Sequence, residues 1–151
     1  MESSILTLLI FIPVAGAILM LPFAMVYGKE NAHYYKWIAV ITTGIQLALA
    51  FLLYQNYDPA LSITDSPFTI QVDWIKHFNI QYFIGVDGLS MPMVLLTALL
   101  SFICIIASWK IEKQKLGYFS LFLLLDAGMM GVFLSLDFFL FYIFWEVMLL
   151  P

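Results

Sequence analysis

Residues 4–27 of the 151-residue chain read SILTLLIFIPVAGAILMLPFAMVY and contain no charged side chain. A helix needs about 18 to 25 apolar residues to cross a hydrocarbon core of about 30 Å, so this stretch predicts a transmembrane helix. Pro13 and Pro22 lie inside it, which membrane helices tolerate where neighbouring helices or water satisfy the freed carbonyls. A cleaved signal peptide would start with basic residues and have a shorter apolar run, whereas Glu2 is acidic and this run continues to Tyr27. We therefore expect a first span that is retained.

The whole chain has this apolar character. Hydrophobic residues make up 64% of it, aromatic residues 17% and charged residues 11%, and the mean hydropathy is +1.00. A soluble domain carries about twice as many charged residues, so the composition indicates a membrane protein. The net charge of −4 argues against nucleic acid as a partner. The single cysteine, Cys104, cannot form a disulfide or a metal site by itself.

Further apolar segments predict an all-α membrane fold with about five transmembrane helices. After residues 4–27, the predicted spans are residues 35–54, 90–109, 117–135 and 137–151. Residues 55–84 form a long loop outside the membrane, and its alternating apolar and polar side chains predict a β-hairpin within residues 68–86. Residues 1–151 are then a single membrane domain.

Local signals refine these helices. Ser90 is the expected N-cap of the third span, which places Pro92 in the first turn, and Asp137 is expected to open the fifth span. Small residues four apart lie on one helix face and predict close helix packing. The two pairs are Gly44 with Ala48 and Ala127 with Gly131.

The lysines predict the orientation of the chain in the membrane. Five of the six fall in the links after the first and third spans: Lys29, Lys36, Lys110, Lys113 and Lys115. The long loop carries only Lys76. By the positive-inside rule, the two lysine-rich links face the cytoplasm, and the N-terminus and residues 55–84 face the outer side.

Two carboxylates lie deep inside the predicted spans. Glu146 follows Asp137 by nine residues and Asp126 follows Lys115 by eleven, which corresponds to depths of about 14 and 16 Å. An ionised acid at the bilayer centre costs at least about 2.5 to 3.5 kcal/mol, so such residues usually have a function. A proton relay is the functional hypothesis, and a protonated acid that only holds helices together is the alternative.

The sequence does not decide whether Asp126 and Glu146 face one another, because the rotation of each helix is unknown. All six lysines fall in the links or in the long loop. We therefore expect a cationic partner of Glu146 to come from another chain or from residues beyond Pro151.

Two stretches resemble a known family. Residues 82–90, YFIGVDGLS, followed by Pro92, resemble the segment that enters the third helix of the antiporter-like subunits of respiratory complex I. Residues 136–151, LDFFLFYIFWEVMLLP, resemble the fifth helix of these subunits. Together they are most similar to the subunit M family of NADH:quinone oxidoreductase. The resemblance covers the whole chain and about the first third of the family's chain.

The resemblance implies a 14-helix antiporter-like fold with two inverted five-helix repeats, each forming a proton half-channel. Glu146 would be the proton-relay acid, paired with a lysine on the seventh helix, and Asp126 a second candidate. A chain truncated in its fifth helix at Pro151 would lack that lysine and would not pump protons by itself.

The function implied is that of a proton-translocating subunit in the respiratory chain, which couples quinone reduction to proton transfer. This chain would bind no cofactor or metal, and NADH, FMN, iron–sulfur clusters and quinone would belong to partner subunits. Its partners would be the lipid bilayer and other membrane subunits of complex I, including further antiporter-like ones, in a bacterial inner membrane. Two alternatives stay open: a subunit of a cation/proton antiporter or membrane-bound hydrogenase complex, and a structural or assembly membrane protein without transport.

Overall fold

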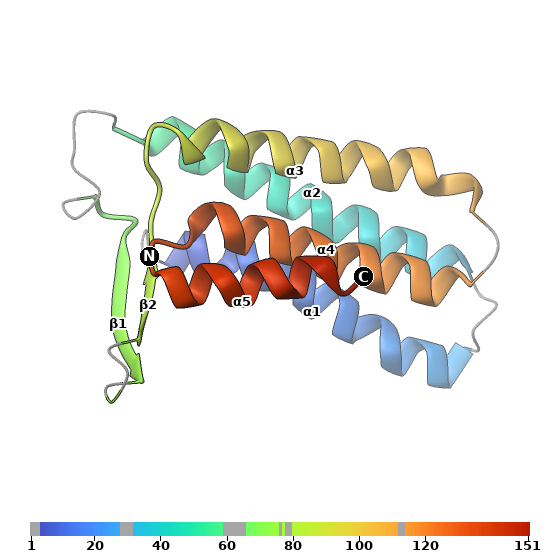
Figure 1. The fold of residues 1–151 in the computed structure, drawn as a ribbon. Helices are drawn as coiled ribbons and strands as arrows, with labels where there is room; N and C mark the ends of the chain where they lie inside the picture. Colours follow the sequence, from blue (N-terminus) through green and yellow to red (C-terminus); the bar gives the residue numbers. More distant parts are fainter. Residues whose placement is uncertain (1–3, 28–31, 59–65, 76, 78–79, 112–113) are drawn as a thin grey trace.

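The computed structural model describes residues 4–27, 32–58, 66–75, 77, 80–111 and 114–151. In these residues, α-helices run alternately up and down as a bundle, and a β-hairpin lies across one end of it (Figure 1). We call this end the hairpin end. The elements are α1 (Ser4–Tyr27), α2 (Ala32–Asn56), β1 (Ile70–Ile75), β2 (Ile80–Ile84), α3 (Ser90–Ala107), the 3-10 turn η2 (Ser108–Lys110), α4 (Lys115–Leu134) and α5 (Phe138–Leu149).

The helices confirm the predicted membrane fold. Four segments of the described chain are long and apolar enough to cross a bilayer: Ser4–Phe23, His33–Asn56, Ser90–Lys110 and Lys115–Leu134. The helix α5 is as apolar but has 12 residues. It begins where expected, because the Asp137 carboxylate accepts hydrogen bonds from the N–H groups of Phe139 (2.9 Å) and Leu140 (3.0 Å). The chain is therefore an integral membrane protein.

The predicted hairpin is also confirmed. The strands β1 and β2 pair antiparallel, with Ile70 opposite Ile84, and an irregularity follows Asp73. On one face, the side chains of Gln71, Gln81 and Asp73 are joined by hydrogen bonds of 2.6 and 2.9 Å. An isolated two-stranded hairpin is only marginally stable, so this one needs further support.

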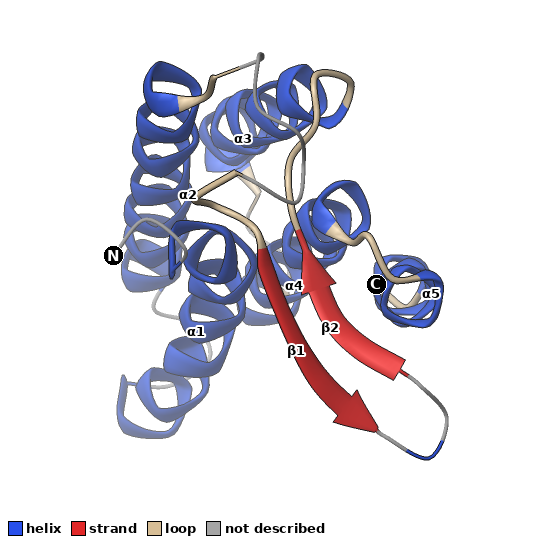
Figure 2. Ribbon diagram, turned by 90° about the vertical axis from the view of Figure 1, so that its left-hand side faces the viewer, coloured by secondary structure: helices blue, strands red, loops and turns tan. Residues whose placement is uncertain are grey.

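That support comes from the turn between α4 and α5. The N–H of Gly85 donates to the carbonyl of Leu134 at 2.9 Å, and the N–H of Leu136 donates to the carbonyl of Phe83 at 2.8 Å. Figure 2 shows β2 beside the end of α4. The hairpin is therefore fixed to the bundle by backbone hydrogen bonds as well as by side-chain packing.

The central helix of the bundle is α4, which contacts each of the other four helices, whereas α5 packs mainly on α4 (Figure 2). Buried apolar side chains form two clusters along the helices. One lies towards the hairpin end and includes Leu6, Leu53, Val94 and Leu134. The other lies towards the opposite end and includes Met20, Ala39, Ile105 and Phe119.

Close packing of α4 and α5 depends on glycine. A Cβ atom at Gly131 would overlap the ring of Phe144, and one at Gly128 would lie 2.9 Å from the backbone nitrogen of Met148. Ala127 is buried beside them. The small residues predicted on this span therefore do permit a close helix contact.

The corresponding prediction for Gly44 and Ala48 is wrong. Ala48 is exposed, and a Cβ at Gly44 would lie 3.5 Å from the nearest ring atom of Phe102, an ordinary contact. The close approach of α2 to α1 occurs instead at Gly16, where a Cβ would lie 2.7 Å from the hydroxyl oxygen of Thr42. The spacing identified a shared face of α2, but that face is not the most tightly packed one.

The predicted N-cap of α3 also needs correction. Ser90 is the first residue of the helix, and the capping side chain is Asp87, whose Oδ1 accepts from the N–H groups of Ser90 (2.6 Å) and Leu89 (3.1 Å). A carboxylate oxygen can accept both bonds at once, which a serine hydroxyl does less well. These bonds hold the pKa of Asp87 below its usual range, and the bond from the Ser90 N–H has the largest effect. Pro92 lies in the first turn, as predicted.

Candidate functional site

Asp126 lies in the middle of α4 and is completely buried. The hydroxyl of Ser101, on α3, donates a hydrogen bond of 2.5 Å to its Oδ1. The side-chain amide of Gln46, on α2, also lies beside this carboxyl group. Gln46 and Ser101 are buried as well, so the structure brings three polar side chains together between the two apolar clusters.

Gln46 links this group to α1. Its Nε2 donates to the backbone carbonyl of Leu9 at 3.1 Å. In a regular helix that carbonyl would accept from the residue four positions later, but this is Pro13, which has no N–H. The expectation that a neighbouring helix satisfies the carbonyl freed by Pro13 is thus confirmed. We call the Leu9 carbonyl, Gln46, Ser101 and Asp126 the four-helix polar cluster, because each of α1 to α4 contributes one member.

Two atoms of this cluster have unmet hydrogen-bonding capacity. Among the described residues, Gln46 Oε1 and Asp126 Oδ2 are the buried side-chain polar atoms that have no hydrogen-bond partner. Gln46 Oε1 can only accept hydrogen bonds, and when the carboxyl group is ionised Asp126 Oδ2 can also only accept them. Buried polar atoms are usually paired, so this pattern requires a physical explanation.

Glu146 has a different environment. It lies on an exposed face of α5, one turn from Tyr142, whose hydroxyl interacts with its carboxyl group. Phe144 and Met148 contact α4, and at 3.6 residues per turn Glu146 points to the opposite side of α5. The same exposed face carries Phe138, Tyr142, Trp145 and Leu149.

The structure answers the question of whether the two acids face one another. Asp126 contacts α3 through Ser101, whereas α4 meets α5 at Gly128 and Gly131. Those glycines lie roughly opposite Asp126 on the helix. Asp126 and Glu146 therefore point away from the α4–α5 interface in opposite directions, and the described side chains form no direct path between them.

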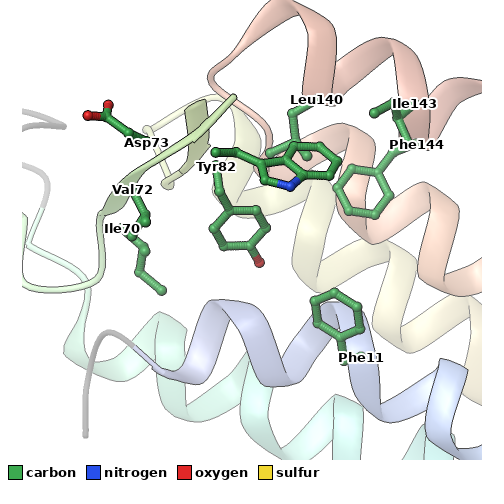
Figure 3. Close-up of a pocket in the computed structure, with 9 residues that line it drawn as sticks. Phe11, Ile70, Val72, Asp73, Tyr82, Leu140, Ile143 and Phe144 are labelled. Carbon is green, nitrogen blue, oxygen red and sulfur yellow. The ribbon is translucent and has the colours of Figure 1, made fainter. Parts of the chain in front are cut away.

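An apolar groove lies under the hairpin, with a volume of about 540 Å³ (Figure 3). Its walls include Phe11 of α1, Ile70, Val72 and Tyr82 of the hairpin, and Leu140, Ile143 and Phe144 of α5. In Figure 3 the carboxylate of Asp73 points away from the other labelled side chains. Burial raises the pKa of the Tyr82 hydroxyl, so at neutral pH this group is protonated. The groove therefore offers an apolar surface rather than acid–base chemistry.

Other reactive side chains are dispersed. In the part of the chain that the structure describes, no three His, Cys, Asp or Glu residues are grouped as metal ligands. Cys104 is a free thiol on the exposed side of α3. His33 accepts a hydrogen bond of 2.9 Å from the indole of Trp37 at the end opposite the hairpin.

Comparison with known proteins identifies relatives over nearly the whole chain. Residues 5–137 match the family model described as the amino terminus of NADH-ubiquinone oxidoreductase chain 4. The chain is 40% identical over 121 residues to NADH-quinone oxidoreductase subunit M of Escherichia coli K12, covering 77% of this chain and 24% of that protein. It is 34% identical over 148 residues to NAD(P)H-quinone oxidoreductase chain 4 of Synechococcus sp. CC9605, covering 97% and 27%.

A third relative carries a different name. The chain is 34% identical over 147 residues to F(420)H(2) dehydrogenase subunit M of Methanosarcina mazei, covering 93% of this chain and 29% of that protein. The chain thus spans between about a quarter and three tenths of the length of these relatives.

Proposed function

Because the chain belongs to the NADH-ubiquinone oxidoreductase chain 4 family, we propose that it forms the amino-terminal membrane domain of a proton-translocating subunit of complex I. In this proposal Glu146 takes up and releases protons. NADH, FMN, iron–sulfur clusters and quinone are bound by partner subunits, which include further antiporter-like ones. Family membership supports the wider context, since the Escherichia coli relative is named as a subunit of NADH-quinone oxidoreductase.

The observation that carries the proposal is the position of Glu146. It lies about 14 Å along the helix from Asp137, on the side of α5 that does not contact α4. An ionised carboxylate at this depth is too costly to face lipid, so this side of α5 requires a polar or protein environment. We infer that other parts of the subunit cover it and supply a cationic partner.

Such a partner gives a simple mechanism. A nearby cation stabilises the ionised carboxylate, and withdrawal of the cation favours the protonated form. A lysine that moves towards Glu146 would therefore release its proton, and movement away would allow another to bind. The Tyr142 hydroxyl, one turn away, would orient the carboxyl group during this exchange.

Asp126 remains a second candidate for proton transfer. It is buried and bonded to Ser101, but it lies on the far side of α4 from Glu146. Its position therefore supports a separate role better than direct exchange with Glu146.

The orientation and membrane are part of the same proposal. The first residues of α2 and α4 and the turn η2 lie at the end of the bundle opposite the hairpin (Figure 1), and these segments contain Lys36, Lys115 and Lys110. The positive-inside rule places that end in the cytoplasm and the N-terminus and hairpin on the outer side of a bacterial inner membrane.

The test is Glu146→Gln in the full-length subunit within its assembled complex. NADH-driven proton uptake into inverted membrane vesicles should be strongly reduced, while subunit content by native electrophoresis is unchanged. Asp137→Asn is the matched control: it removes a carboxylate at the start of the same helix and keeps the cap, so proton uptake should be retained. Normal proton uptake in a fully assembled Glu146→Gln complex would refute the proposal.

The relative named as an F(420)H(2) dehydrogenase subunit supports one related alternative, a subunit of a different membrane complex such as an antiporter or hydrogenase. Identification of the proteins that copurify with the full-length subunit separates these functions. Flavin and iron–sulfur subunits support complex I, whereas a set of small membrane subunits without redox centres supports an antiporter. A purely structural role instead predicts that Glu146→Leu has no effect on proton uptake.

A further inference from the structure

The four-helix polar cluster contains too few hydrogen-bond donors if Asp126 is ionised. The donors are the hydroxyl of Ser101 and the amide of Gln46, one of whose N–H bonds is used by the Leu9 carbonyl. An ionised carboxylate can accept about four hydrogen bonds. Asp126 Oδ2 nevertheless has no partner, and the neighbouring Gln46 Oε1 has none either.

The orientation of the Gln46 amide is fixed by Pro13. Exchanging the amide nitrogen and oxygen would direct Oε1 at the Leu9 carbonyl, which has lost its helical donor because residue 13 is proline. That arrangement would leave two acceptors facing each other. The Nε2 atom of Gln46 therefore stays directed at the Leu9 carbonyl, and Oε1 stays an unpaired acceptor.

We propose that the four-helix polar cluster is a proton-binding site, in which Asp126 carries the proton at neutral pH and Gln46 and Ser101 position it. The proton comes from a hydronium ion of the aqueous phase: an O–H bond of that ion breaks, an O–H bond forms on the carboxylate, and a water molecule is left. A proton on Oδ2 removes the buried charge and converts this unpaired acceptor into a donor. This site is independent of the role proposed for Glu146.

The burial of Asp126 favours the neutral acid, whereas its hydrogen bonds with Ser101 and Gln46 favour the ionised form. The groups that face it among the described residues are Ser101 from α3 and Gln46 from α2, with the Leu9 carbonyl of α1 behind Gln46, and all are uncharged. The contact surface for α5 is on the opposite side of α4. Asp126 is completely buried, and a charge without a counter-charge is costly inside a membrane.

The proposal is tested by infrared spectroscopy of the assembled complex with the full-length subunit and aspartate labelled with ¹³C at its side-chain carboxyl. The difference spectrum of wild type minus Asp126→Asn at neutral pH should show loss of the C=O stretch of a protonated acid. Loss of a carboxylate stretch instead would overturn the proposal. Glu146→Gln should leave the labelled band unchanged, so this proposal and the relay role of Glu146 can fail separately.

Ser101→Ala covers the case in which Asp126→Asn does not assemble. It removes the hydrogen bond to Oδ1 and should shift the labelled acid band. Ser120→Ala is the matched control, because the hydroxyl of Ser120 donates to a carbonyl of its own helix at 2.7 Å, and it should cause no shift. A shifted carboxylate band in Ser101→Ala, or an unchanged acid region, would overturn the proposal.

Discussion

The contact between α4 and α5 can be tested by adding one carbon atom. In Gly131→Ala, the new Cβ would overlap three ring atoms of Phe144, so the two helices must separate or the ring must leave its rotamer. Overpacking of this kind costs about 1 to 3 kcal/mol, and alanine recovers about 0.5 to 1 kcal/mol of helix propensity. Because a rigid ring is displaced, we expect a net loss of stability of about 2 kcal/mol. Thermal unfolding of the purified full-length subunit, followed by tryptophan fluorescence, measures this loss.

Gly117→Ala is the control for that experiment. Gly117 lies in the same helix, and a Cβ there would meet nothing within 4 Å, so stability should be unchanged or slightly increased. The double variant Gly131→Ala/Phe144→Ala should lose less stability than the sum of the single variants, because removing the ring removes the overlap. If Gly131→Ala and Gly117→Ala unfold at the same temperature, the packing of α5 on α4 described above is wrong.

Two further predictions concern hydrogen bonds at α3 and α1. Asp87→Ala should destabilise the full-length subunit by about 1 kcal/mol at neutral pH, because α3 loses its cap. The folded-state pKa of Asp87 is lowered, so its charge contributes stability above the unfolded pKa of about 3.9, which is lost as the pH falls through the folded value. Asp87→Asn should keep the cap and abolish this pH dependence in unfolding titrations; the same dependence in both proteins would contradict the assignment. Gln46→Leu should lower the free energy of unfolding by about 0.6 to 2 kcal/mol. The loss should be smaller when Gln46→Leu is combined with Pro13→Ala, because alanine restores an N–H donor for the Leu9 carbonyl. Strictly additive effects in this double-mutant cycle would refute the hydrogen bond between Gln46 and that carbonyl.

Hydropathy and turn chemistry were sufficient to predict the helices and the hairpin. Asp137 could be assigned to the start of α5 because a carboxylate before an apolar run has few other roles. The assignment failed at α3, where Asp87 and Ser90 are both good capping residues three positions apart. Their hydrogen bonds, rather than their residue types, decide which of them caps the helix.

Helix rotation was beyond prediction because a span that is apolar on every side has no pattern to orient it. The position of Asp126 and Glu146 on opposite sides of the α4–α5 pair follows from Ser101 and from the two glycines of α4, which are far apart in sequence. The role of Gln46 was missed. Its signal was present, since a proline inside a span frees a carbonyl and a lone amide in the next span is a natural donor for it.

The hydrogen bonds between the hairpin and the turn after α4 bear on how the chain is made. Phe83 and Gly85 bond to residues about fifty positions later in the chain, Leu136 and Leu134. While the protein is being synthesised, the outer edge of β2 has no backbone partner until α4 has been inserted and its C-terminal end lies on the hairpin side. Unpaired strand edges readily bind the wrong partner. Pairing of this strand edge is therefore a late step in the folding of the chain. Variants that delay insertion of α4 should leave the hairpin accessible to proteases and chaperones for longer.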